Sequence, residues 1–215
     1  MGRLYEATWG RGFAALYDRM LSGTEEAGLR DRRRELLAQA RGATLELGAG
    51  TGLNLDLYPD AVTELVLTEP SEHMARHLRD RAQNVERAVE VVEAPAELLP
   101  FPDDRFDTVT ATLVLCTVDD PERTLAEVDR VLKPDGRFLF LEHVRSSDPR
   151  LARWQDRLEQ PWRFVGAGCH CNRDTLATVR ASGLRVESLD HGELPKSPPI
   201  VRPLVAGSAR APAQP

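Results

Sequence analysis

Residues 45–54 read LELGAGTGLN, and this stretch constrains the fold more than any other part of the chain. An apolar strand is predicted to end in Gly48, Gly50 and Gly52, with a short helix expected after Thr51. Glycine permits tight turns and lets a ligand approach the bare backbone. A strand, a glycine loop and a helix in this order direct free backbone N–H groups at the anionic end of a ligand.

A second apolar run, residues 65–68, ends in Glu69 about twenty residues after the loop. A carboxylate at such a strand tip can accept hydrogen bonds from both hydroxyls of a ribose. The dinucleotide fingerprint would have its third glycine at position 53, where Leu53 stands. A nucleoside cofactor is therefore favoured, and a nicotinamide cofactor or a purely structural turn are the alternatives.

Strands and helices alternate along the rest of the chain, which predicts an α/β fold whose sheet carries helices on both faces. We expect one domain over residues 1–206, with an N-terminal helical cap at 1–40 and a disordered tail at 207–215. Ser71 and Asn172 are predicted helix N-caps. Strands are predicted near 44–48, 64–69, 89–94, 106–115, 137–144, 184–190 and 200–206, and helices over 5–40, 71–84, 121–132, from 149 onward and 172–183.

Composition excludes several functional classes. The net charge of -6 argues against a nucleic-acid partner, because phosphate binding needs a basic surface. The basic run at 30–34 has a helical pattern and is expected to be a solvated helix face. No apolar run approaches the roughly 20 residues of a membrane span, and no signal peptide is visible. Three cysteines without a secretion signal predict reduced thiols and a cytoplasmic location.

Four later segments, in this order, resemble motifs of the class I S-adenosylmethionine (SAM)-dependent methyltransferases, of the small-molecule type 11 kind. They are residues 69–74 (EPSEHM), 96–101 (AELLPF), 106–115 (FDTVTATLVL) and 132–136 (LKPDG). The resemblance implies a Rossmann-like, doubly wound, seven-stranded sheet, mostly parallel with one antiparallel strand near the C-terminus. It also implies SAM as cofactor and a small-molecule substrate.

The same resemblance assigns the cofactor site residue by residue. An acidic residue common before Ala96 is here Pro95, which leaves side-chain bonding to adenine open. Tyr17 resembles an N-terminal tyrosine that closes over the cofactor, or it is a core aromatic of an amphipathic helix. The implied SAM-binding residues are Glu46, Gly48, Ala49, Gly50, Thr51, Gly52, Asn54, Glu69, Pro70, Met74, Ala96, Glu97, Thr112 and Leu113.

A closer resemblance, to the methyltransferase-like alkyl-thiol methyltransferases, rests on residues 112–118, 142–144, 168–173 and 201–203. It implies S-methylation of a small, rather apolar thiol. N- or O-methylation of a small metabolite or lipid headgroup, and a non-catalytic SAM-binding role, stay open. Animal members carry an N-terminal membrane anchor, but no integral membrane span is expected here; the oligomeric state is left open.

His143, at the predicted tip of a strand, is the best-placed candidate base for the acceptor, and His170 is the second. Each is alternatively a structural histidine. The Cys169-His170-Cys171 run resembles part of a metal-binding site. No metal is expected, however, because a recognisable set of four ligands is absent. Cys116 is expected to face the pocket. Arg173 and Arg202 either receive an anionic group of the substrate or form surface ion pairs. The apolar residues of this region line the pocket or belong to the core; they are Leu113, Val114, Trp154, Trp162 and Phe164.

Overall fold

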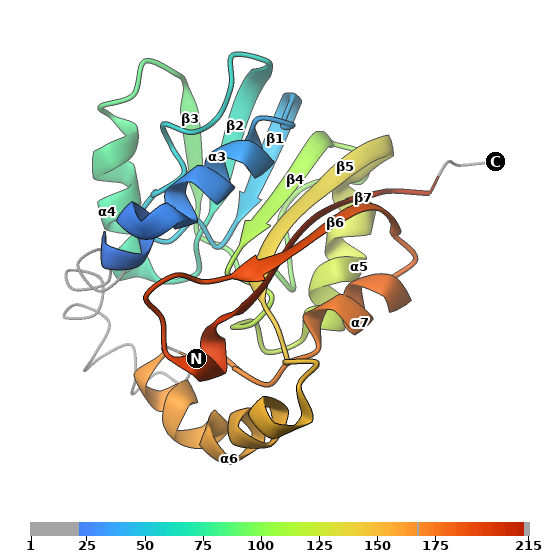
Figure 1. Cartoon of the computed structure of the whole chain (residues 1–215). Helices are drawn as coiled ribbons and strands as arrows, with labels where there is room; N and C mark the ends of the chain where they lie inside the picture. The colour runs from blue at the N-terminus through green and yellow to red at the C-terminus, as the bar shows by residue number, and fades with distance from the viewer. Residues whose placement is uncertain (1–21, 167, 213–215) are drawn as a thin grey trace.

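The computed structural model describes residues 22–166 and 168–212, and its seven strands form one twisted sheet (Figure 1). The strand order is β3-β2-β1-β4-β5-β7-β6. Strands from β3 to β5 pair in parallel, whereas β7 is antiparallel to both of its neighbours. The predicted Rossmann-like fold is confirmed. The strands are β1 (Gly42–Leu47), β2 (Val62–Thr68), β3 (Val89–Val92), β4 (Phe106–Thr112), β5 (Leu132–His143), β6 (Arg185–Glu193) and β7 (Pro203–Arg210).

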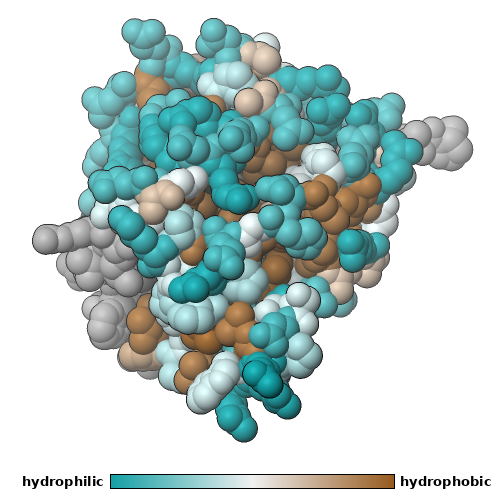
Figure 2. Space-filling view, viewed as in Figure 1, coloured by the Kyte–Doolittle hydropathy of each residue, from teal (hydrophilic) through white to brown (hydrophobic). Residues whose placement is uncertain are grey.

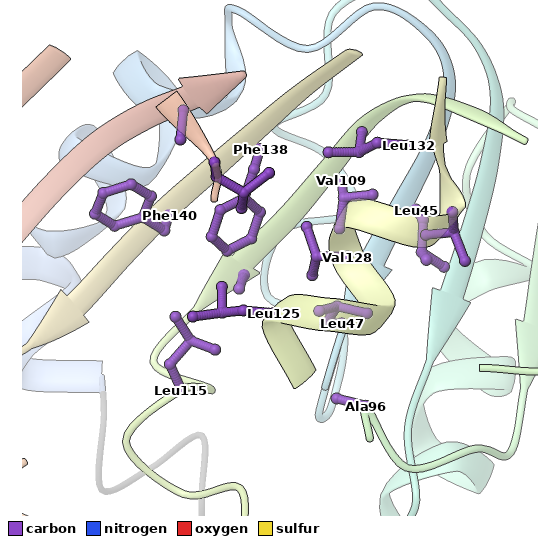
Figure 3. Close-up of a cluster of buried hydrophobic side chains, with 14 of the residues drawn as sticks. Leu45, Leu47, Ala96, Val109, Leu115, Leu125, Val128, Leu132, Phe138 and Phe140 are labelled. Atoms are coloured by element: carbon purple, nitrogen blue, oxygen red, sulfur yellow. The ribbon is translucent and has the colours of Figure 1, made fainter. Parts of the chain in front are cut away.

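Helices cover both faces of the sheet, and the alternation of side chains along β5 shows why. Phe138 and Phe140 point to one face, where Leu125 of the helix α5 packs against them (Figure 3). Leu139 and Leu141 point to the other face and join a second buried cluster with α3 and α4. The helical segments are η1 (Glu25–Leu29), α3 (Arg30–Leu37), α4 (Glu72–Ala82), α5 (Pro121–Val131), α6 (Pro149–Val165), α7 (Thr175–Ala181) and η2 (Pro199–Val201).

Three local predictions are wrong. Residues after Thr51 form successive tight turns instead of a short helix. Asp174 caps α7 by accepting the Ala177 N–H at 3.0 Å, whereas the Asn172 side chain binds Asp156. The tail expected from residue 207 is instead the second half of β7, which pairs with β5 as far as Arg210.

The surface seen in Figure 2 is mostly hydrophilic, with apolar side chains gathered over α6 at the bottom of the view. Trp154 and Phe164 of this helix are 54% and 62% exposed, which excludes the core reading for both and leaves pocket lining as the open one. Among the described residues, no helix combines the length and apolarity needed to cross a membrane.

Candidate functional site

The glycine loop lies at the carboxyl end of β1, where a parallel sheet of this kind binds its ligands. Gly48, Gly50 and Gly52 all have positive φ angles, of 53°, 60° and 87°. A Cβ atom at Gly48 would lie 3.0 Å from the Val114 side chain, so the loop depends on glycine there. The loop continues as a tight turn, in which the Gly52 N–H donates to the carbonyl of Ala49 at 3.0 Å.

Glu69 follows β2 directly and lies against this loop. Its Oε2 atom accepts the Gly50 N–H at 2.9 Å, and its Oε1 atom accepts the Ser71 N–H at 2.9 Å. An ionised carboxylate is an acceptor with several lone pairs, the kind of group that ribose hydroxyls bind. The contact places the predicted ribose-binding carboxylate beside the predicted glycine loop, as a bound SAM requires.

Behind the loop is a buried polar network around Glu46. Its Oε1 atom accepts from Asn54 Nδ2 at 2.7 Å, and its Oε2 atom accepts from the Tyr58 hydroxyl at 2.8 Å. Burial raises the pKa of Glu46 to about 7, although these hydrogen bonds and the nearby Arg33 oppose the rise. The Glu46 carboxylate therefore orders the loop from behind, through Asn54.

Arg33 joins this network from α3, and no local pattern distinguishes it from the other arginines of the run at 30–34. Its Nη1 atom donates to Asn54 Oδ1 at 3.1 Å and to Thr112 Oγ1 at 2.9 Å. Its Nε atom pairs with Glu25 at 3.1 Å. The solvated helix face predicted for residues 30–34 is thus wrong at Arg33, which is buried, while Arg34 and its partner Asp31 are exposed.

The remaining predicted cofactor residues differ in their surroundings. Ala96 is buried, Pro70 is exposed and Met74 is partly buried. The Glu97 carboxylate accepts backbone N–H groups from Asp119 and Asp120, and so braces the segment after β4. Leu113 has a φ angle of 60°, an uncommon conformation for a residue with a branched side chain. Ala49 and Thr51 are buried within the glycine loop. Tyr17 lies outside the described residues.

A second group of side chains lies at the carboxyl ends of β4 and β5. His143, the last residue of β5, has its Nε2 atom 2.7 Å from the Sγ atom of Cys169. One ligand atom each from Cys116, His143 and Cys169 lies within 4.8 Å of the others, and all three residues are buried. All three cysteines of the chain are free thiols.

Electrostatics favours a thiolate on Cys169. A hydrogen bond from the Cys116 thiol, together with His143, lowers the pKa of Cys169, and the same hydrogen bond and burial raise the pKa of Cys116. Although burial opposes it, the Cys169 thiolate raises the pKa of His143. His143 Nδ1 is buried without a hydrogen-bond partner among the described residues. Each of these residues could be singled out from the sequence, but the meeting of Cys116 with His143 could not be predicted.

Neighbouring groups hold this cluster in place. The Glu142 carboxylate accepts the backbone N–H groups of Val114, Leu115 and Cys116 at 2.9–3.3 Å, and burial raises its pKa to about 7. The His170 N–H donates to the Cys116 carbonyl at 2.8 Å, which ties the two cysteine-bearing loops together. These bonds fix the backbone on either side of the sulfur atoms.

The Cys169-His170-Cys171 run does not act as one unit. Cys171 directs its thiol to the backbone carbonyl of Gln155 at 3.5 Å, and burial raises its pKa to about 11. His170 Nδ1 pairs with Glu159 at 2.8 Å, away from the cluster.

The arginines and tryptophans of this region also have definite places. Arg173 donates to the carbonyls of Leu115 and Val118, and Arg202 donates to the carbonyl of Ser197, so the expected surface ion pairs are wrong for both. Trp162 is partly buried and donates its indole N–H to Cys169 Sγ at 3.2 Å.

Known proteins resemble the chain in both sequence and structure. A family model described as a methyltransferase domain matches residues 45–140. Thiol S-methyltransferase TMT1B of Homo sapiens is 37% identical over 174 residues, which cover 74% of this chain and 71% of that protein. Phosphatidylethanolamine N-methyltransferase of Cereibacter sphaeroides is 32% identical, over 67% of this chain and 74% of that protein. A crystal structure from Thermotoga maritima, described as a SAM-dependent methyltransferase and possible histamine N-methyltransferase, has a TM-score of 0.68 and 25% identity over 98% of this chain and 100% of that one.

Proposed function

Because this chain belongs to the class I SAM-dependent methyltransferases, we propose that it transfers the methyl group of SAM to a small-molecule thiol. The observation that carries the proposal is the buried pairing of His143 with Cys169 at the carboxyl end of β5, across the sheet edge from the glycine loop. The 37% identity to a thiol S-methyltransferase supports the same acceptor.

SAM carries its methyl group on a sulfonium, and the transfer is an in-line displacement that needs the two reactants aligned in contact. In this proposal Glu69, which lies against the glycine loop, accepts the ribose hydroxyls. The backbone at Gly48 and Gly50 and the Thr112–Leu113 turn hold the methionine end of the cofactor. Tyr17, which lies outside the described residues, stays a proposed closing residue.

His143 is the proposed base for the acceptor proton. Its Nε2 atom faces Cys169, so the proton of an incoming thiol is proposed to pass to the imidazole–thiolate pair. A thiol with a pKa near 8.5 is a few per cent ionised at neutral pH and needs little assistance. Glu142, the neighbouring carboxylate, already accepts three backbone N–H groups. It therefore holds the segment after β4, and the proposal gives it no role toward the acceptor.

N-methylation of an amine, such as a lipid headgroup, is the second candidate, and the 32% identity to a phosphatidylethanolamine N-methyltransferase favours it. Initial rates should be measured with an alkyl thiol and with the amine and alcohol of the same carbon skeleton. S-adenosylhomocysteine formation is the common readout. The proposal expects the thiol to be the fastest acceptor at neutral pH. A faster amine would replace the thiol assignment with the second candidate.

A cytoplasmic location is part of the proposal, since the free state of Cys116, Cys169 and Cys171 suits a reducing compartment.

A further inference from the structure

Three soft or borderline donors converge from segments far apart in the sequence. Cys116 lies in the turn after β4, His143 ends β5, and Cys169 lies between α6 and α7. Their donor atoms lie within 4.8 Å of one another. Thiolate sulfur and imidazole nitrogen are the ligands preferred by Zn²⁺ and by other thiophilic d¹⁰ cations.

We propose that Cys116, His143 and Cys169 form a three-ligand binding site for a thiophilic divalent cation such as Zn²⁺ or Cd²⁺. From the bond lengths of tetrahedral zinc, two ligand atoms on one ion lie roughly 3.6–3.8 Å apart. The observed limit of 4.8 Å is close to this spacing, and the 2.7 Å contact between His143 and Cys169 has to lengthen when an ion binds between the two atoms. Shifts of about 1 Å would bring the three atoms to the spacing of one tetrahedral ion.

The surroundings are suited to hold such ligands. The Glu142 carboxylate and the His170 N–H fix the backbone of Cys116 on both sides. The Trp162 indole donates its N–H to the Cys169 sulfur at 3.2 Å, as outer groups commonly do for a metal-bound thiolate. The His143 side chain makes its one described polar contact with Cys169, so its nitrogen is not committed to a carbonyl or carboxylate elsewhere.

Charge also favours the cation. Two adjacent buried thiolates repel each other, so without an ion the pair carries one shared proton. A divalent cation neutralises both sulfur charges and leaves a site of zero net charge. With three protein ligands, the fourth tetrahedral position stays open.

The cation has a consequence for methyl transfer, and this consequence rests on the proposed function. An ion bound to His143 takes up the imidazole lone pair that would receive the acceptor proton. Zn²⁺ or Cd²⁺ should therefore inhibit turnover, while SAM binding at the glycine loop stays unchanged.

The test is a titration of the full chain with Cd²⁺ alone. Binding is measured by the absorbance of the ultraviolet cadmium–thiolate charge-transfer band. One equivalent with the intensity of two thiolates is expected. Cys116→Ser and Cys169→Ser should each weaken binding by more than about 100-fold, because losing a direct ligand costs more than losing an outer partner. Cys171→Ser is the matched control, a buried thiol two residues from Cys169 that lies outside the cluster, and it should bind as the wild type does.

Calorimetry with SAM checks that each variant retains its fold. No charge-transfer band in the wild type, or equal loss of binding in Cys171→Ser when it still binds SAM, would overturn the metal site. If Cd²⁺ binds as expected but turnover is unaffected, the metal site stands and the base role of His143 fails.

Discussion

His143 Nε2 and Cys169 Sγ lie 2.7 Å apart, although 26 residues separate them in the sequence. The contact joins the end of β5 to the loop between α6 and α7. It brings an imidazole and a thiol together next to a second thiol in Cys116, and in the proposed function this pair is the centre of the acceptor end.

The first prediction concerns the ionisation of Cys169. The Cys116 hydrogen bond and His143 both lower its pKa, so one thiolate should persist well below the range of a free thiol. Ultraviolet thiolate absorbance during an acid titration measures this. Cys169→Ser should remove the low-pH step, and Cys171→Ser should leave it in place. A wild-type protein with all three thiols protonated at neutral pH would contradict the pairing.

His143→Ala should slow thiol methylation by less than the 10²–10⁴-fold that a single general base usually supplies, because a thiol is already a few per cent ionised at neutral pH. The deficit should be largest at low pH and shrink as pH rises toward the pKa of the acceptor thiol, because the acceptor then ionises without help. Rate profiles over pH for the variant and the wild type measure this. His170→Ala is the control, since its ring pairs with Glu159 instead. Identical profiles for wild type and His143→Ala would return His143 to a structural role.

Glu69→Ala should weaken SAM binding by roughly 1.5–3 kcal/mol, as expected for lost charge-assisted hydrogen bonds. The substitution also removes the acceptors of the Gly50 and Ser71 N–H groups and so loosens the glycine loop. Titration calorimetry with SAM measures the effect. Glu72→Ala, which removes an exposed carboxylate three residues away, should bind SAM normally. Unchanged affinity in Glu69→Ala would refute the ribose assignment.

Glu46 predicts a pH dependence of stability. Burial raises its folded-state pKa to about 7 from 4.5, so the folded protein binds this proton more tightly than the unfolded chain. The stabilisation is complete below pH 4.5 and is lost as pH rises through 7, by an amount on the order of 3 kcal/mol.

Glu46→Gln should keep the contacts to Asn54 and Tyr58 and reduce this loss, so that its free energy of unfolding falls less than that of the wild type between these two pH values. Urea unfolding at several pH values measures the difference. Glu35→Gln, at an exposed position of α3, is the control. A wild-type slope in Glu46→Gln would show that Glu46 is ionised in the folded protein throughout this range.

Local sequence patterns were enough to predict the sheet and the place of the glycine loop beside Glu69. The glycine loop and Glu69 each follow directly after an apolar strand, so a short stretch of sequence was enough to recognise each of them. Because parallel strands meet at one edge, their carboxyl ends could be placed together from the sequence alone. The contact between Gly50 and Glu69 has this origin.

Features that depend on packing between distant segments could not be predicted. Arg33 lies in a run of charges with a helical pattern that is typical of a solvated face. Its burial follows from the packing of α3 against the sheet, where it donates to Thr112 of β4. The small residues of β7 had the composition of a frayed tail. In the fold their size allows close packing, since a Cβ atom at Gly207 would lie 2.6 Å from the ring of Phe140. The meeting of Cys116 with His143 likewise has no local signal.

The most direct test of thiol methylation is mass spectrometry of the product formed from SAM with a deuterated methyl group and a small alkyl thiol. We expect the label on sulfur, as a methyl thioether formed in equal amount with S-adenosylhomocysteine, and no such product from an alcohol of the same skeleton. Label found on nitrogen in a competing amine, with none on the thiol, would contradict the proposed function.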